Sequence, residues 1–170
     1  MKTANAIFGT LLLLGAGVQL HFIFAYSGWL EQRPALAYLP IYYSLSLPVL
    51  MFYYVKFNLY PRYRLRLTDL KHFLLPLGQF LYLWVMWGVV AWRQPGGRSF
   101  YNLFYGGLEQ GIFLAFFPLY LLFARAYWRA RRRQLGLISL PRTLWYLRKL
   151  MKGSFFFFLS YGIFGGQLIF

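Results

Sequence analysis

The sequence predicts an all-α fold: a polytopic membrane helical bundle with four to five transmembrane helices. Of the 170 residues, 60% are apolar and 24% are aromatic, whereas only 12% are charged. The acids are Glu31, Asp69 and Glu109, so a water-soluble fold would have too little polar material to cover its surface. The basic residues cluster between long apolar segments, which lack the alternation of an outer-membrane barrel. Because each span must satisfy its own backbone hydrogen bonds, we expect helices throughout.

The apolar segments are long enough to cross a bilayer, whose hydrocarbon core of about 30 Å requires about 20 helical residues. We expect a single transmembrane domain over residues 1–170, and the spans are predicted at about residues 6–27, 36–59, 70–92, 100–124 and 153–170. The last span begins at either Leu144 or Gly153. The first span is expected to stay uncleaved, because its apolar run exceeds that of a signal peptide and no small-residue cleavage site follows.

Prolines and capping residues mark the predicted boundaries. Pro61 ends the second span, and Thr68 or Asp69 is the expected N-cap of the third. Residues 94–97, Gln-Pro-Gly-Gly, predict a tight turn, and Pro141 predicts a new helix after it. That helix is amphipathic and is expected to lie in the membrane interface before entering the bilayer. Its apolar face comprises Leu144, Leu147, Leu150 and Met151.

The distribution of Arg and Lys predicts the orientation. Fifteen of the 18 basic residues fall in the N-terminus, the second loop and the fourth loop, which are therefore expected in the cytoplasm. The predicted location is the bacterial inner (cytoplasmic) membrane, multi-pass, with the N-terminus cytoplasmic. Basic residues beside the membrane also attract anionic lipids, at about 1 kcal/mol each. The predicted lipid-contact residues are Arg62, Arg64, Arg66, Arg129, Arg131, Arg132, Arg133, Arg148 and Lys149. Nucleic acid is not an expected partner.

Most signatures of enzyme chemistry are missing from the sequence. There is no cysteine, and the two histidines, His21 and His72, cannot make a multi-histidine metal site. No paired carboxylates and no phosphate-binding glycine loop occur. We therefore expect no catalytic residue, no cofactor and no metal.

Glu109 is the leading candidate for a functional residue, because an acid inside a predicted span is costly. It is expected to face protein, and other polar residues are predicted at a similar depth. They are Gln110, His21, Gln19, Tyr42, Tyr43, Ser44 and Ser46. Two interpretations stay open: a ligand or proton site, and a hydrogen bond that joins neighbouring helices. Gly107 and Gly111 flank the acid and favour close helix approach, and with it self-association or other membrane subunits as partners.

Three segments resemble a known family. They are "KTANAIFGTLLLLGAGVQLHF", "LSLPVLMFYYVKFNLYPRYRLRLTDLKHFLLPLGQF" and "LWYLRKL". Through these three segments the chain resembles the N-terminal multi-helix membrane region of Bacteroidota AraC-type membrane regulators. Residues 47–53, 72–76 and 145–148 occupy the positions of that region's recurring motifs. The resemblance implies a sensing role, and because the sequence stops before a DNA-binding domain, no direct transcription control by this chain.

The sequence therefore predicts a non-enzymatic integral membrane protein, either a sensor-like module or an accessory or scaffold subunit of a membrane complex. The alternative is a small transporter or channel that uses Glu109 as a proton or cation site.

The predicted orientation can be tested by cysteine labelling, because the chain has no native cysteine. Single cysteines at Arg98 and Arg131 are exposed to an impermeant thiol reagent in intact cells. We expect position 98 to react and position 131 to stay protected until the membrane is opened. Labelling of position 131 but not of position 98 would contradict the predicted orientation.

Overall fold

The computed structural model describes residues 2–29, 39–93, 108–135 and 142–165, and in these ranges the predicted all-α fold is confirmed. Five α-helices and one 3-10 helix are present, and these parts of the chain contain no strand. In chain order they are α1 (Lys2–Tyr26), α3 (Ser46–Leu59), the 3-10 helix η2 (Leu67–Phe73), α4 (Leu74–Arg93), α6 (Glu109–Gln134) and α7 (Arg142–Gly165).

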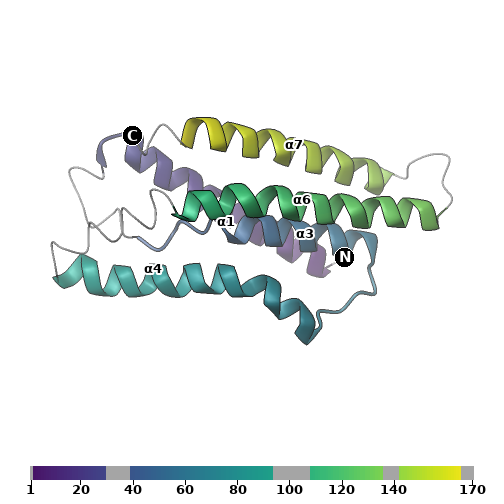
Figure 1. Ribbon diagram of the computed structural model, residues 1–170, viewed down its shortest axis with the longest axis horizontal. Helices are drawn as coiled ribbons and strands as arrows, with labels where there is room; N and C mark the ends of the chain where they lie inside the picture. Colours follow the sequence, from purple (N-terminus) through teal and green to yellow (C-terminus); the bar gives the residue numbers. More distant parts are fainter. Residues whose placement is uncertain (1, 30–38, 94–107, 136–141, 166–170) are drawn as a thin grey trace.

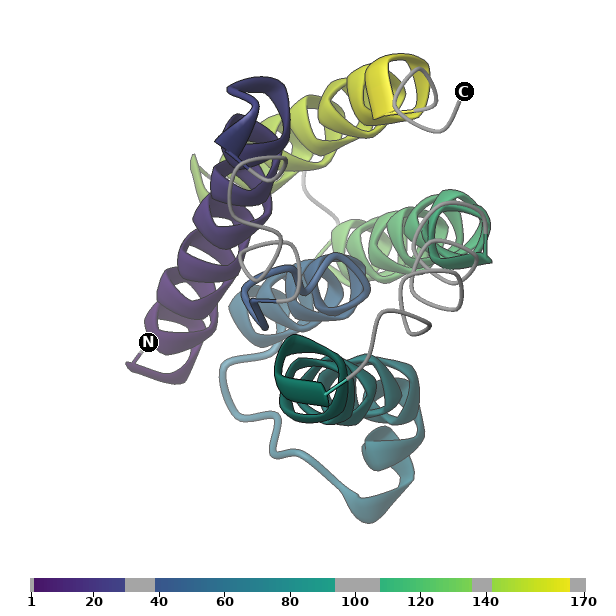
Figure 2. The same cartoon turned by 90° about the vertical axis from the view of Figure 1, so that its left-hand side faces the viewer.

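Helix α3 forms the centre of the bundle. Viewed end-on, it lies in the middle with α1, α7, α6 and α4 around it (Figure 2). Helices α1, α6 and α7 contact it directly, and α6 also contacts α7. Four residues of α3 are half-buried, and they recur every four positions: Ser46, Leu50, Tyr54 and Asn58. All the remaining residues of α3 are buried. A helix that is apolar on nearly all sides is the expected occupant of a core.

Successive helices run in opposite directions (Figure 1). The N-terminal end of α1, the C-terminal ends of α3 and α6 and the N-terminal end of α7 all lie toward the right of that view. At this end Trp128 on α6 donates its indole N–H to the carbonyl of Leu144 on α7, at 3.0 Å. The basic residues of the predicted second and fourth loops are therefore brought to the same end of the bundle.

The second helix is shorter than the predicted span of residues 36–59. Helix α3 begins at Ser46, and residues 39–45 form turns and irregular backbone. Pro48 accounts for the difference, because its missing N–H and its ring are tolerated in a first helical turn but would disrupt a helix that continued upstream. At 14 residues, α3 is only about 21 Å long.

The other boundaries also differ from the predicted spans. Helix α6 continues ten residues past the predicted end of the fourth span, because Arg125 to Gln134 are good helix formers with no proline among them. Helix α7 begins at Arg142, directly after Pro141 as predicted, and runs to Gly165 without interruption. Of the two expected starts of the last segment, Leu144 is therefore close and 153 is not. The predicted N-cap, Thr68 or Asp69, was also wrong: η2 starts at Leu67 and its N-cap is Arg66.

Two helices are long and apolar enough to cross a membrane: the segment Thr3–Phe24 of α1 and helix α6. The criterion is length and composition alone, and it applies to the part of the chain that the structure describes.

Gly17 allows α1 to approach the irregular segment before α3. A Cβ atom at this position would lie 2.5 Å from the backbone oxygen of Ile41, which cannot move without shifting the segment. We expect Gly17→Ala to lower the free energy of unfolding in detergent by about 1–3 kcal/mol. The matched control is Gly15→Ala on the same helix, where a Cβ would meet no atom within 4 Å. The control should be neutral or slightly stabilising, and equal melting temperatures for the two variants would contradict this packing.

Candidate functional site

Two clusters of buried polar side chains lie at opposite ends of α3. The first, here called the cap cluster, consists of Ser44, Gln79 and Glu109. The second, the charge cluster, consists of Lys56, Tyr63 and Asp69.

The cap cluster joins three segments of the chain. Glu109, in the first turn of α6, accepts hydrogen bonds on Oε1 from the hydroxyl of Ser44 and from Nε2 of Gln79 on α4, the latter at 2.7 Å. Nε2 of Gln79 also lies 3.3 Å from Ser44 Oγ. The exposed fractions of Ser44, Gln79 and Glu109 are 0%, 2% and 2%, so the three side chains are closed off together.

The cap cluster also satisfies the backbone at the start of α3. The first N–H groups of a helix have no partner within that helix, and this end is favourable for negative charge. The N-cap residue Leu45 has no capping side chain of its own, and its N–H donates to Oε1 of Gln79 at 3.1 Å. Gln79 therefore performs, from α4, the role that a local capping residue performs elsewhere, and Glu109 holds the Gln79 amide in place through Nε2.

The expectation that Glu109 faces protein and meets a donor is confirmed, because Ser44 is one of the predicted neighbours. Its predicted depth in a span from residue 100 stays a prediction, because residues 100–107 lie outside the described residues; in the part that is described, Glu109 stands in the first turn of α6. Gly111 does not bring a helix close: its position is exposed, and an added Cβ would meet nothing within 4 Å. Gly107 lies outside the described residues.

The remaining predicted polar residues do not join Glu109. The ring of His21 lies 5.0 Å from that of Tyr42, and its buried Nδ1 has no hydrogen-bond partner among the residues the structure describes. Gln19 is exposed, and Gln110 is half-buried. The ring of Tyr43 stacks on Phe80 instead. Whether any of these residues binds a ligand stays a prediction.

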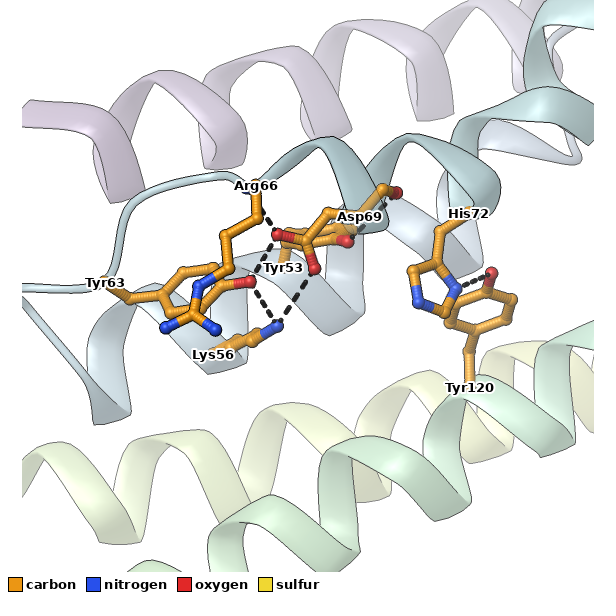
Figure 3. A network of polar contacts seen from close by, with 7 residues as sticks. All are labelled: Tyr53, Lys56, Tyr63, Arg66, Asp69, His72 and Tyr120. Carbon is orange, nitrogen blue, oxygen red and sulfur yellow. Dashed lines mark hydrogen bonds and ion pairs between the residues drawn. The ribbon is translucent and has the colours of Figure 1, made fainter.

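The charge cluster closes the other end of α3, and Figure 3 shows its arrangement. Nζ of Lys56, in the last turn of α3, lies 3.3 Å from Oδ1 of Asp69 and 2.7 Å from the hydroxyl of Tyr63. The Tyr63 hydroxyl donates to Oδ2 of Asp69, and the backbone N–H of Arg66 donates to the same atom at 2.8 Å. Both charged side chains are only 9% exposed.

Aromatic rings surround the Lys56 ammonium. Nζ lies 3.9 Å from the ring centre of Tyr63 and 5.4 Å from those of Tyr53 and Tyr127. Cation–π attraction of this kind is strongest where water is excluded. Lys56 is one of the basic residues assigned to the second loop when the orientation was predicted from the sequence. The structure corrects this, because Lys56 is buried on α3 and makes no contribution to the exposed basic surface.

Opposing effects act on the carboxyl of Asp69. Burial disfavours its ionised form, but the hydrogen bonds from Tyr63 and from the Arg66 backbone, with the charge of Lys56, outweigh burial and lower its pKa. Burial, followed by the hydrogen bond to Asp69, raises the pKa of the Tyr63 hydroxyl. Tyr63 therefore stays protonated and Asp69 stays ionised at neutral pH.

His72 connects η2 to α6. Its Nδ1 lies 2.9 Å from the hydroxyl of Tyr120, as the right-hand part of Figure 3 shows. Its side chain is half-buried and packs against the rings of Phe52 and Tyr53. The histidine thus helps to attach η2 to the bundle.

Sequence reasoning missed Gln79 and the pairing of Lys56 with Asp69. A signal was present in each case. Gln79 is an isolated polar residue in the apolar run "LLPLGQFLYLWVMWG", and Lys56 is the only charge in "SLPVLMFYYVKFNL". Because an isolated charge on a buried helix needs a counter-charge, the partner had to be one of three acids. The sequence does not show which acid is near.

The predicted lipid-contact residues lie on the surface. Arg131 is half-buried, and the other members of the set are exposed: Arg62, Arg64, Arg66, Arg129, Arg132, Arg133, Arg148 and Lys149. The guanidinium of Arg131 lies 5.3 Å from the ring centre of Tyr60, and Nζ of Lys149 lies 3.9 Å from that of Trp145.

Compared with known proteins, the chain matches no family model, no curated protein and no solved structure. The resemblance to AraC-type membrane regulators is not tested by these comparisons and stays a prediction.

Removal of one partner of the buried ion pair should be costly. Asp69→Asn leaves the Lys56 ammonium without a counter-charge, so we expect the free energy of unfolding in detergent to fall by about 3–5 kcal/mol. Folding lowers the pKa of Asp69. The contribution of ionised Asp69 to the free energy of unfolding is therefore fully present above the unfolded pKa of about 3.9, and it is lost as the pH falls from there toward the folded pKa. Melting temperatures of the wild type and the variant should differ by a constant amount from about pH 7 to pH 5 and approach each other below about pH 4.

The control for this prediction removes both charges. Lys56→Met combined with Asp69→Leu leaves no unpaired buried charge and should recover much of the loss. A double variant as unstable as Asp69→Asn would show that the ion pair is not the source of the effect.

Proposed function

We propose that this chain is a non-enzymatic, multi-pass protein of the bacterial inner membrane that acts as a sensor-like module or as an accessory or scaffold subunit of a membrane complex. The observation that carries the proposal is the closure of both polar clusters. Asp69 and Glu109, the two acids that the structure describes, are buried and hydrogen-bonded within the chain. These carboxylates hold segments of the chain together, Asp69 through both of its oxygens and Glu109 through Oε1.

The membrane placement is supported by the two apolar helices and by the distribution of charge. Helix α6 has 26 residues, with Glu109 in its first turn and Arg131 in its last. The two residues therefore lie about 30 Å apart along the axis, which is the thickness of a hydrocarbon core. In this placement the N-terminus and the two basic segments face the cytoplasm, and the cap cluster lies toward the opposite side.

The outer faces of the helices are apolar. Leu13 and Ile23 on α1 and Leu74 and Val85 on α4 are at least 60% exposed. Such surfaces suit acyl chains or the helices of another subunit, or of a second copy of this chain. The expected partners are accordingly the lipid bilayer, anionic lipids and other membrane chains.

A small transporter or channel is the alternative function, because a buried acid that contacts two other segments is a common feature of proton and cation pathways. In this alternative Glu109 would change its protonation state or bind a cation during transport. The observed role of Glu109, which is to accept from Ser44 and Gln79, requires only an acceptor.

Glu109→Gln separates the two functions, because Gln keeps an oxygen that can accept from Ser44 and Gln79 but cannot ionise. We expect membrane insertion, melting temperature and co-purifying subunits to stay as in the wild type. Glu109→Leu is the matched control: it leaves two buried donors unpaired and should lower stability by about 1–3 kcal/mol. Proton or cation flux into proteoliposomes that is present in the wild type and lost in Glu109→Gln would instead establish transport.

A further inference from the structure

A surface pocket opens beside the charge cluster at the basic end of the bundle. Its volume is about 480 Å³, and it is lined by Tyr60, Pro61, Arg62, Tyr63 and Arg131. The first four residues connect α3 to η2, and Arg131 comes from the last turn of α6. Two arginines from distant parts of the sequence thus line one cavity.

The connection after α3 is a turn that fixes one wall of the pocket. The N–H of Tyr63 donates to the carbonyl of Tyr60 at 2.9 Å, and Pro61 occupies the second position of this turn. Proline at that position presets the backbone, so Arg62 is presented from a rigid support. The hydroxyl of Tyr63 is held by Lys56 and Asp69, which orients the ring that lines the cavity.

The opposite wall is also ordered. The guanidinium of Arg131 is half-buried and lies 5.3 Å from the ring centre of Tyr60, and Nη1 approaches Oε1 of Gln134 at 3.5 Å. Tyr60 is in turn packed edge-on against Tyr127 of α6. Cation–π attraction to this ring helps to hold the Arg131 guanidinium in position.

No carboxylate among the described residues is free to pair with these arginines. The Asp69 oxygens are taken by Lys56, Tyr63 and the Arg66 backbone, and Glu109 lies at the other end of α3. The pocket therefore combines two arginines, aromatic walls and a net positive charge that neither of the two described acids neutralises.

We infer that this pocket binds a phosphate group, held between the guanidinium groups of Arg62 and Arg131. Guanidinium matches the geometry of phosphate oxygens with paired N–H donors. The inference rests on the proposed membrane function, which places the pocket at the level of the cytoplasmic headgroups. An anionic phospholipid and a soluble phosphate compound present the same group, and the experiment has an arm for each source.

The test uses substitutions that keep the net charge. The full chain in detergent is titrated with short-chain phosphatidylglycerol, with short-chain phosphatidylcholine and with inorganic phosphate, and bound ligand is measured by native mass spectrometry and by the shift in melting temperature. We expect saturable binding of the phosphatidylglycerol and a loss of affinity of about tenfold or more in Arg131→Lys. Arg125→Lys, exposed on the same helix but outside the pocket and outside the predicted lipid-contact set, is the control and should bind as the wild type does.

Arg62→Lys is a second variant, on an exposed turn, and is also expected to weaken binding. Saturation by inorganic phosphate with the same sensitivity at position 131, and no gain from the lipid, would support the pocket and identify a soluble phosphate as its ligand. Equal affinity of Arg131→Lys and Arg125→Lys for phosphatidylglycerol, or equal binding of the two lipids that neither variant changes, would overturn the inference. Failure of the proposed membrane function would be a separate outcome. It would be shown by extraction of the chain from membranes with alkaline carbonate.

Discussion

The burial of one charged residue, Lys56, in the last turn of the central helix determines much of this structure. An ammonium removed from water must be compensated, and Asp69 compensates it from η2, 13 positions later. This requirement brings the connection after α3 back onto the helix and fixes Tyr63 between the two charges. The same tyrosine lines the pocket beside Arg62 and Arg131. The phosphate site that we infer therefore depends on the geometry of the buried ion pair.

The opposite end of α3 solves a different physical problem. At 14 residues the helix is too short to cross a hydrocarbon core, and the chain before it is irregular. In the membrane placement that we propose, irregular backbone inside the bilayer persists only where protein satisfies its polar groups. Here Gln79 accepts from the Leu45 N–H, and Glu109 accepts from the Ser44 side chain. Gln79 thus acts as a cap supplied by another helix, and the buried acid orients it.

The two clusters together explain how the helices around α3 are positioned. The cap cluster connects the start of α3 to α4 and α6, and the charge cluster connects its end to η2. His72 then links η2 to Tyr120 of α6. A ligand at the pocket would contact Tyr63, whose hydroxyl is bonded to both members of the ion pair. Events at the basic surface would in this way reach the core helix, as the proposed sensor-like role requires.

The sequence by itself determined the helical class, the approximate positions of α1, α4 and α7 and the exceptional status of Glu109, because composition, apolar run length and isolated charges are local properties. It also indicated that Glu109 would face protein, since an acid among apolar residues must find a donor. Only the tertiary structure decided that Gln79 joins Ser44 at this acid, that Lys56 pairs with Asp69, and that Arg62 and Arg131 line one pocket. These contacts join residues that are distant in sequence, and they depend on the rotation and depth of each helix. Those quantities are set by packing around α3, which no single segment encodes.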